Sequence, residues 1–217
     1  MGGEGDVLSA AWLSLSVSAA AVAIAALVGV PLAAALAMSR SRWRAPLVVA
    51  ARVGMSFPTV LVGLLVFGLY SRRGPLGGWD LLFTPQAIVT GEVLLAFPLI
   101  VALAESAVAS LDPRFMETAR ALALPRARVV RLAVSEAREG VVVALLAAFA
   151  RCVTELGVAL LVGGNLRGET RTLTTAIALE TSRGDFDRAL RLGWVLVALA
   201  VALNLGLALL RRGRAAA

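Results

Sequence analysis

One uncharged stretch, from Leu13 to Met38, limits what this chain can fold into more than any other feature. It holds about 26 residues, and at 1.5 Å per residue a helix of that length extends roughly 39 Å. The hydrocarbon layer of a bilayer is about 30 Å thick, so such a helix crosses it. A cleaved signal peptide is the alternative, but the residues before the stretch are acidic and its apolar part exceeds the ~7–15 residues of a signal peptide. We therefore expect a membrane-spanning helix.

The composition agrees with a membrane protein. Of the 217 residues 59% are hydrophobic and only 16% are charged, and the mean hydropathy is +0.87. Such values are atypical of a soluble domain of this length. The sequence predicts an all-α integral membrane protein, a single domain over residues 1–217. Its roughly five transmembrane helices are expected at 13–38, 46–70, 85–108, 141–162 and 192–210.

The residue types that are missing exclude much chemistry. All 21 cationic residues are arginine, and the chain has no lysine and no histidine. A lysine-containing phosphate loop, a Schiff base, a Ser-His-Asp triad and a histidine-ligated zinc are therefore excluded. Cys152 is the single cysteine, so no disulfide forms within the chain. We expect no metal site and no cofactor bound by this chain.

The net charge of +7 reflects membrane topology rather than nucleic-acid binding. The arginines are spread through the loops, and no aromatic-interleaved basic face accompanies them. Loops rich in positive charge stay in the cytoplasm. With the amino terminus outside and the carboxyl terminus inside, twelve arginines fall in cytoplasmic segments and seven in external ones. The cytoplasmic ones are Arg40, Arg42, Arg44, Arg114, Arg120, Arg126, Arg128, Arg131, Arg138, Arg211, Arg212 and Arg214. This orientation is the prediction, with a multi-pass protein in the cell (inner) membrane.

The longest polar segment, residues 109–140, is predicted to be helical. Asp112 can cap a helix that begins at Pro113 and continues to Leu124. A second helix is expected to begin at Pro125 and to merge with the fourth span near Gly140.

The first of these helices is amphipathic. Phe115, Ala119 and Leu122 follow one another at helical spacing, beside the charged Glu117 and Arg120. Two interpretations fit such a stripe: the helix lies on lipid headgroups, or its apolar side enters a groove on a soluble partner.

The same residues carry a family resemblance. The run from Glu117 to Ala123, Glu-Thr-Ala-Arg-Ala-Leu-Ala, resembles the E-A-A-x-x-x-G loop of ABC importer permeases. In that family the loop forms a coupling helix that binds the ATPase subunit. The resemblance implies this role for Phe115, Glu117, Thr118, Ala119, Arg120, Leu122 and Ala123. Two departures concern the turn after the helix: Ala123 replaces the usual glycine, and Ser135-Glu136 stands where many members have Leu-Pro.

Further segments are similar to the oxyanion branch of these permeases. They are 149–157 (Phe-Ala-Arg-Cys-Val-Thr-Glu-Leu-Gly), 162–165 (Val-Gly-Gly-Asn), 168–177 and 178–185, and they are most similar to tungstate permeases. The resemblance implies a type I ABC importer permease-like core with a cytoplasmic coupling helix. It also implies a homodimer in the lipid bilayer, two cytoplasmic ABC ATPase subunits that hold ATP and Mg²⁺, and an extracytoplasmic oxyanion-binding protein. Tungstate is the expected substrate, with molybdate or sulfate as alternatives.

Two charged residues inside the fourth span are candidates for the translocation path. Arg151 and Glu155 are four residues apart and are expected on one helix face. A charge at mid-bilayer is costly, so exposure to lipid is excluded. Arg151 suits a tetrahedral oxyanion because its fork of N–H donors matches two oxygens, and Glu155 would hold the guanidinium in position. An ion pair that only stabilises the bundle is the alternative.

Two further polar segments are candidates for the same path. Pro58 is expected to free the Gly54 carbonyl beside the hydroxyls of Ser56 and Thr59, although prolines are also common in transmembrane helices without such a role. A second segment, Gly163, Gly164 and Asn165, reads as a turn at the outer end of the fourth span, or as backbone N–H groups open to an anion.

Other classes of function have weaker support. An intramembrane enzyme would use Glu92, Glu105 or Glu155 as general acid or base, but neither a paired carboxylate nor a nucleophile accompanies them. Glu92 and Glu105 lie nearer the ends of their span, where contact with water is expected. A channel outside the ABC class or a membrane scaffold is the other alternative. We expect a transport subunit without an ATPase site of its own.

Overall fold

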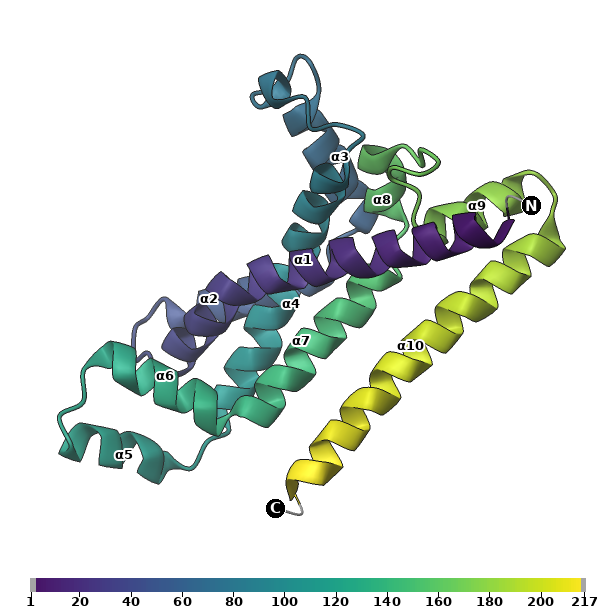
Figure 1. The fold of residues 1–217 in the computed structure, drawn as a ribbon. Coiled ribbons are helices and arrows are strands. Elements are labelled where there is room, and N and C mark those ends of the chain that lie inside the picture. Colours follow the sequence, from purple (N-terminus) through teal and green to yellow (C-terminus); the bar gives the residue numbers. More distant parts are fainter. Residues whose placement is uncertain (1–2, 216–217) are drawn as a thin grey trace.

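Helices account for the regular secondary structure of this chain (Figure 1). The computed structural model describes the backbone of residues 3–215, and their side chains except those of residues 3–4, 116, 120 and 203–215. No strand occurs within this range. The elements are α1 (Gly3–Ala37), α2 (Arg44–Met55), α3 (Thr59–Tyr70), the 3₁₀ turn η1 (Gly77–Trp79), α4 (Pro85–Ala109), α5 (Pro113–Ala121), α6 (Arg126–Glu136), α7 (Arg138–Val153), α8 (Gly157–Gly163), α9 (Leu173–Ser182) and α10 (Phe186–Ala215).

Small side chains bring the long helices together. Helix α1 crosses α4 and α7 (Figure 1), and its Ala21, Ala25 and Ala33 are at most 1% exposed. The hydrophobic effect does not drive helices together in lipid. The close approach of the backbones instead stabilises the bundle through van der Waals contacts. Gly91 of α4 shows how tight the fit is, because a Cβ atom there would lie 2.3 Å from Val158 Cγ1 of α8.

Among the described residues, two helices are long and apolar enough to cross a membrane: α1 over Gly5–Ala37, where the first span was predicted, and α4, where the third was predicted. The second and fourth predicted spans, 46–70 and 141–162, each fall on a bent pair of helices that is long and apolar enough when taken together. The chain bends by 98° between α2 and α3 and by 56° between α7 and α8. Each pair counts as one broken span. Helix α10 covers the predicted fifth span, whose last side chains lie outside the described residues.

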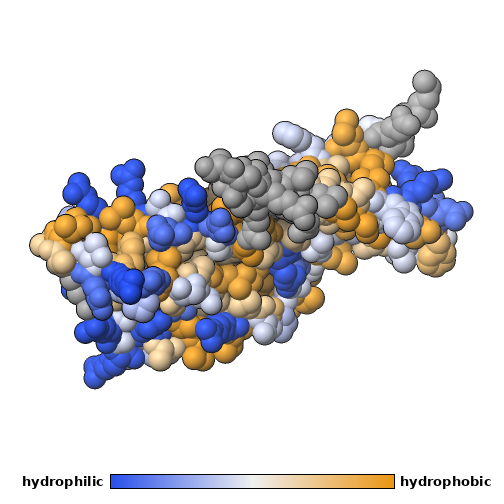
Figure 2. Space-filling model, turned by 90° about the horizontal axis from the view of Figure 1, so that it is seen from below, coloured by the Kyte–Doolittle hydropathy of each residue, from blue (hydrophilic) through white to orange (hydrophobic). Residues whose placement is uncertain are grey.

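The polar parts of the chain lie at the two ends of the bundle. Helices α5 and α6 lie at the same end as the start of α2, and α9 and the amino terminus lie at the other (Figure 1). Figure 2 shows hydrophilic side chains gathered mainly at these ends, with hydrophobic ones dominant between them. This distribution matches a protein that crosses a bilayer along its long direction.

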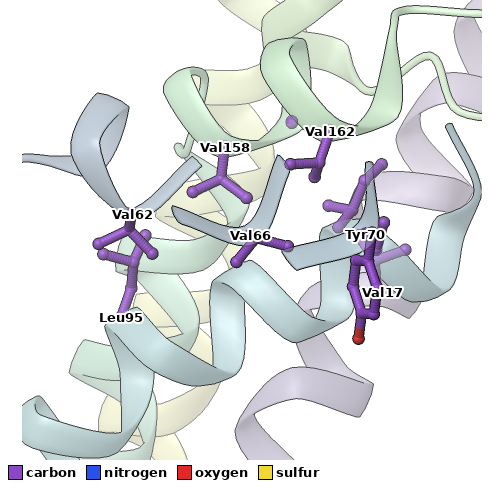
Figure 3. Packing of buried hydrophobic residues seen from close by; sticks show 10 residues of the cluster. Val17, Val62, Val66, Tyr70, Leu95, Val158 and Val162 are labelled. Carbon is purple, nitrogen blue, oxygen red and sulfur yellow. The ribbon is translucent and has the colours of Figure 1, made fainter. Parts of the chain in front are cut away.

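A cluster of apolar side chains holds α3 and α8, the second helix of each bent pair, in place (Figure 3). Val62 and Val66 of α3 contact Val158 and Val162 of α8, and Leu95 of α4 lies in the same cluster. Val17 and Tyr70 also belong to it. The cluster therefore joins α3 to α8, which are more than eighty residues apart in the sequence.

The polar segment 109–140 is helical, as predicted, but its boundaries differ. Asp112 Oδ1 accepts a hydrogen bond from the Arg114 N–H at 2.8 Å, which confirms the cap. Helix α5 ends at Ala121 instead of Leu124. The predicted merger of the second helix with the fourth span is wrong, because α6 ends at Glu136 and a turn at Ala137 separates it from α7.

The early end of α5 has a local cause. Ala123 has φ +47°, in the left-handed region that favours glycine. Its position is the one at which the related loops carry glycine. The turn thus keeps the glycine-like geometry even though the residue is alanine, at a cost of about 1 kcal/mol.

Replacing Ala123 by glycine should therefore stabilise the protein. We expect Ala123→Gly to raise the free energy of unfolding by about 1 kcal/mol in detergent. The matched control is Ala50→Gly, an exposed residue in the interior of α2, which should lower it by about 1 kcal/mol because glycine weakens a helix. Equal destabilisation by both variants would contradict the left-handed turn.

Candidate functional site

The breaks in the two bent spans lie next to each other. A Cβ atom at Gly157, the first residue of α8, would lie 2.9 Å from Thr59 Oγ1, the first residue of α3, and 3.3 Å from Glu155 Oε1. We call the group Thr59, Arg151, Glu155, Gly157 and Thr174 the polar junction. It brings together polar atoms from the two breaks and from α9.

Glu155 is the centre of the polar junction. Its Oε2 accepts a hydrogen bond from Arg151 Nη1 at 3.0 Å, and its Oε1 accepts one from the Val158 N–H at 3.2 Å. Its backbone carbonyl accepts a third from Thr174 Oγ1 at 2.8 Å. The residue is 3% exposed. Glu155 therefore satisfies an N–H at the start of α8, neutralises Arg151 and accepts a hydrogen bond from α9.

The arginine of this pair is open to the surroundings. The prediction that Arg151 and Glu155 share a helix face is wrong, since α7 ends at Val153 and Glu155 lies in the break. The pair forms nevertheless, because the turn carries Glu155 back over the last turn of α7. The Arg151 side chain is 39% exposed, in contrast to the buried carboxylate. Part of the Arg151 side chain is therefore left uncovered by this chain.

The break between α2 and α3 is a capped turn. Ser56 and Pro58 are exposed, and Thr59 is half-buried beside Gly157. The predicted free carbonyl of Gly54 is wrong, because it accepts the Phe57 N–H at 3.3 Å. Of the three candidates here, Thr59 is the one that the structure places at the polar junction.

The segment Gly163, Gly164 and Asn165 forms a packed turn. Gly164 and Asn165 have φ +70° and +53°, and the Gly164 N–H donates to the Leu160 carbonyl at 3.2 Å. The Gly163 carbonyl accepts Thr170 Oγ1, and Asn165 Oδ1 accepts Arg171 Nε at 3.0 Å. These bonds favour the structural interpretation of the segment, and the Gly164 N–H in particular is not open to an anion.

The two carboxylates of α4 are buried, so the expectation that they contact water is wrong. Glu105 is 3% exposed, and its Oε1 accepts a hydrogen bond from Arg44 Nη2 of α2 at 3.0 Å. Glu92 is 2% exposed, and Cys152 Sγ lies 3.8 Å from its carbonyl. Among the described residues, Glu92 Oε2 and Ser18 Oγ are buried without a hydrogen-bond partner. Hydropathy alone could not reveal the Arg44–Glu105 pair, because 61 residues separate its members.

The predicted stripe on α5 largely faces this chain itself. Ala119 is 6% exposed, and Phe115 packs against the buried cluster of α1, α4, α6 and α7. Glu117 and Thr118 are exposed on α5, and Leu122 just after it is 63% exposed. The side chain of Arg120 lies outside the described residues. Among its described side chains, the surface that this segment offers to a partner is thus mainly polar, with Leu122 as a large exposed apolar residue.

The loop after α8 is tied to the start of α1. Arg167 donates from Nε and Nη2 to both carboxylate oxygens of Asp6, the first at 3.1 Å. This hydrogen bonding raises the pKa of Arg167 above its ordinary value. The same pair lowers the pKa of Asp6, so both partners carry their charges at neutral pH.

Comparison with known proteins places this architecture in a family. Residues 12–213 match the binding-protein-dependent transport system inner membrane component. The chain belongs to this family. It is an all-helical ABC importer permease, and a multi-pass inner membrane protein.

Curated relatives and solved structures support the same assignment. The permease is 43% identical to the "Probable anion ABC transporter permease protein" of Haloferax volcanii over 156 residues, 70% of this chain and 67% of that one. It is 39% identical to the tungstate uptake system permease protein TupB of Campylobacter jejuni, over 69% of this chain and 63% of that one. The permease thus matches less than two thirds of that relative's length. A chain of the MetNI methionine ABC transporter has the same fold, with a TM-score of 0.76 and 17% identity over 96% of this chain and 95% of that one.

Proposed function

We propose that this permease is the membrane subunit of an ATP-driven importer that passes tungstate, or a similar tetrahedral oxyanion, into the cytoplasm. The observation that carries the proposal is the polar junction, where the exposed guanidinium of Arg151 is held by the buried Glu155 within the bundle. The similarity to the tungstate permeases of Campylobacter jejuni and Peptoclostridium acidaminophilum supports tungstate. Molybdate is the second candidate, because the ModB permease of Escherichia coli is 30% identical over 68% of this chain.

The pairing of Arg151 with Glu155 suits a site that an anion passes through better than a site that binds the anion tightly. A free guanidinium in a low-dielectric site would hold a dianion tightly. A carboxylate 3.0 Å away offsets part of that attraction and fixes the fork of N–H donors. The anion is thus attracted enough to enter and held weakly enough to leave, and strong selection belongs to a separate binding protein.

The proposed assembly has two copies of this permease around the path. Exposed apolar side chains on α3, such as Val60, Leu64 and Leu65, are between 52% and 55% exposed in the single chain. A two-fold homodimer would cover part of such surface and enclose the open side of the polar junction. Two cytoplasmic ABC ATPase subunits would hold ATP and Mg²⁺, and this chain would not hydrolyse ATP. An extracytoplasmic oxyanion-binding protein would deliver the substrate.

The proposed orientation has the amino terminus outside and α5 in the cytoplasm. Glu117, Thr118 and Leu122 present the exposed surface of the coupling segment to the ATPase. Closure of the ATPase pair on ATP would move this segment, and α6 would transmit the movement to α7 and to Arg151. The coupling rests on a difference in binding between two conformations.

Reconstitution of the complete importer tests the substrate. The permease, its ATPase and its binding protein are placed in proteoliposomes, and uptake of labelled tungstate is measured in competition with molybdate and sulfate. We expect ATP-dependent uptake, with tungstate the strongest competitor. Arg151→Lys keeps the ion pair but loses the planar fork, and should lower uptake roughly fivefold. Arg52→Lys, an exposed arginine of α2, is the matched control and should have no effect. Uptake without ATP, or stronger competition by sulfate, would overturn the proposal.

A charge reversal on α5 tests the coupling. Glu117→Arg should lower ATP-dependent uptake roughly tenfold, because it places a cation on the exposed surface proposed to bind the ATPase. Glu136→Arg makes the same change at an exposed residue of α6 and should leave uptake near the original rate. Co-purification of the ATPase is measured for both variants. Equal uptake by the two variants would show that α5 is not the coupling surface.

A further inference from the structure

A cavity of about 720 Å³ lies at the end of the bundle far from the outer loops, between the end of α1 and the segment formed by α5 and α6. The polar junction does not include any of its lining residues. The lining comes from three places in the sequence: the end of α1 with the loop after it, the end of α5 with its turn, and the start of α6. These residues are Ala35, Met38, Ser39, Arg40, Ser41, Ala119, Ala123, Leu124, Arg126, Val129 and Val130.

The wall of this cavity has two kinds of surface. Met38, Val129 and Val130 belong to an apolar part that makes up most of the lining. Arg40 and Arg126 add two positive charges, and serine hydroxyls lie beside Arg40. Among the lining residues, all of which belong to the described part of the chain, none is acidic. A ligand that fits both surfaces is an amphiphile with an anionic head.

The cavity lies at the level of the lipid headgroups. Helix α1 crosses the hydrocarbon layer and ends at Ala37, so the residues that follow lie at the membrane surface. Trp43 is 61% exposed, and the Arg42 guanidinium lies 5.6 Å from the centre of its ring. Exposed tryptophan and arginine next to the end of a span are typical of the membrane interface.

The cavity lies on the bundle side of α5. Ala119 lines it and is buried, whereas Glu117 and Thr118 are exposed and do not line it. Residues two positions apart on a helix point to nearly opposite sides. Glu117, part of the surface proposed to bind the ATPase, therefore lies on the side of α5 away from the cavity, and an ATPase bound there leaves the cavity available.

We propose that this cavity binds one anionic phospholipid. The phosphate lies between Arg40 and Arg126, and the acyl chains follow the apolar wall at Met38, Val129 and Val130. A volume of about 720 Å³ is within the usual size of a small-molecule site. A basic pocket at the end of a span is the kind of site that anionic headgroups occupy. A free phosphate or the transported oxyanion would leave the apolar wall unused. In the proposed orientation this lipid belongs to the cytoplasmic leaflet, and the outcome expected with bound ATPase rests on the proposed function.

Native mass spectrometry of the complete permease with its ATPase tests the proposal. Phosphatidylglycerol and phosphatidylcholine with identical acyl chains are titrated in detergent, and we expect a clear preference for phosphatidylglycerol. Each arginine contributes about fivefold, so the double variant Arg40→Gln, Arg126→Gln should weaken phosphatidylglycerol binding roughly 25-fold. The control is Arg128→Gln, Arg131→Gln, which removes the same charge from exposed residues of α6 outside the cavity.

A second variant removes volume instead of charge. Ala35 is exposed on α1 and lines the cavity, so Ala35→Phe should displace the lipid while both arginines remain. Glycerol phosphate and tungstate are tested as soluble competitors and should not displace phosphatidylglycerol. Equal binding of the two lipids, equal loss in the control variant, or displacement by a soluble anion would overturn the proposal. So would loss of the lipid when the ATPase binds. None of these outcomes depends on which anion is transported.

Discussion

Backbone hydrogen bonding inside hydrocarbon is the constraint on which the rest of this structure depends. Two of the predicted spans are broken, and a broken helix in lipid is tolerated only where other parts of the protein satisfy the freed groups. Glu155 does most of this at the second break, because its carboxylate accepts the Val158 N–H while its carbonyl accepts the Thr174 hydroxyl. The same carboxylate binds Arg151. Glu155 thus both satisfies the backbone at the break and holds the guanidinium of Arg151 inside the bundle.

The packing around the breaks follows from small residues. Gly63 of α3 and Gly91 of α4 leave room for α8, since a Cβ at either position would lie within 3 Å of Leu161 or Val158. This closeness places Thr59 beside Gly157, and with it the start of α3 beside the start of α8. The polar junction is therefore a consequence of tertiary packing, and neither span would form it alone.

Hydropathy located the spans but could not show that two of them bend. Pro58 signals the first break, although its angle depends on what packs against α3. Thr154, Glu155 and Leu156 give no comparable signal, and the support for that break comes from Thr174, which is 19 residues further along. Periodicity likewise identified an apolar side on α5 without showing that Ala119 would be covered by this chain itself. The left-handed turn at Ala123 was visible only as a departure from the glycine of related loops. Local patterns reveal which residues are apolar or charged, whereas their partners are set by the fold.

The most direct measurement of the central claim is the proximity of the two breaks. In a Cys152→Ala background, Thr59→Cys and Gly157→Cys would place two thiols within disulfide distance, because a Cβ at Gly157 lies 2.9 Å from Thr59 Oγ1. Mild oxidation of the purified permease should then abolish labelling of both thiols, and a reductant should restore it. In a control pair, Gly68→Cys and Gly157→Cys, the first thiol lies near the end of α3, away from the break. Both thiols of this pair should stay labelled after oxidation. If oxidation leaves the thiols of the first pair reactive, the two breaks do not meet and the polar junction described here does not exist.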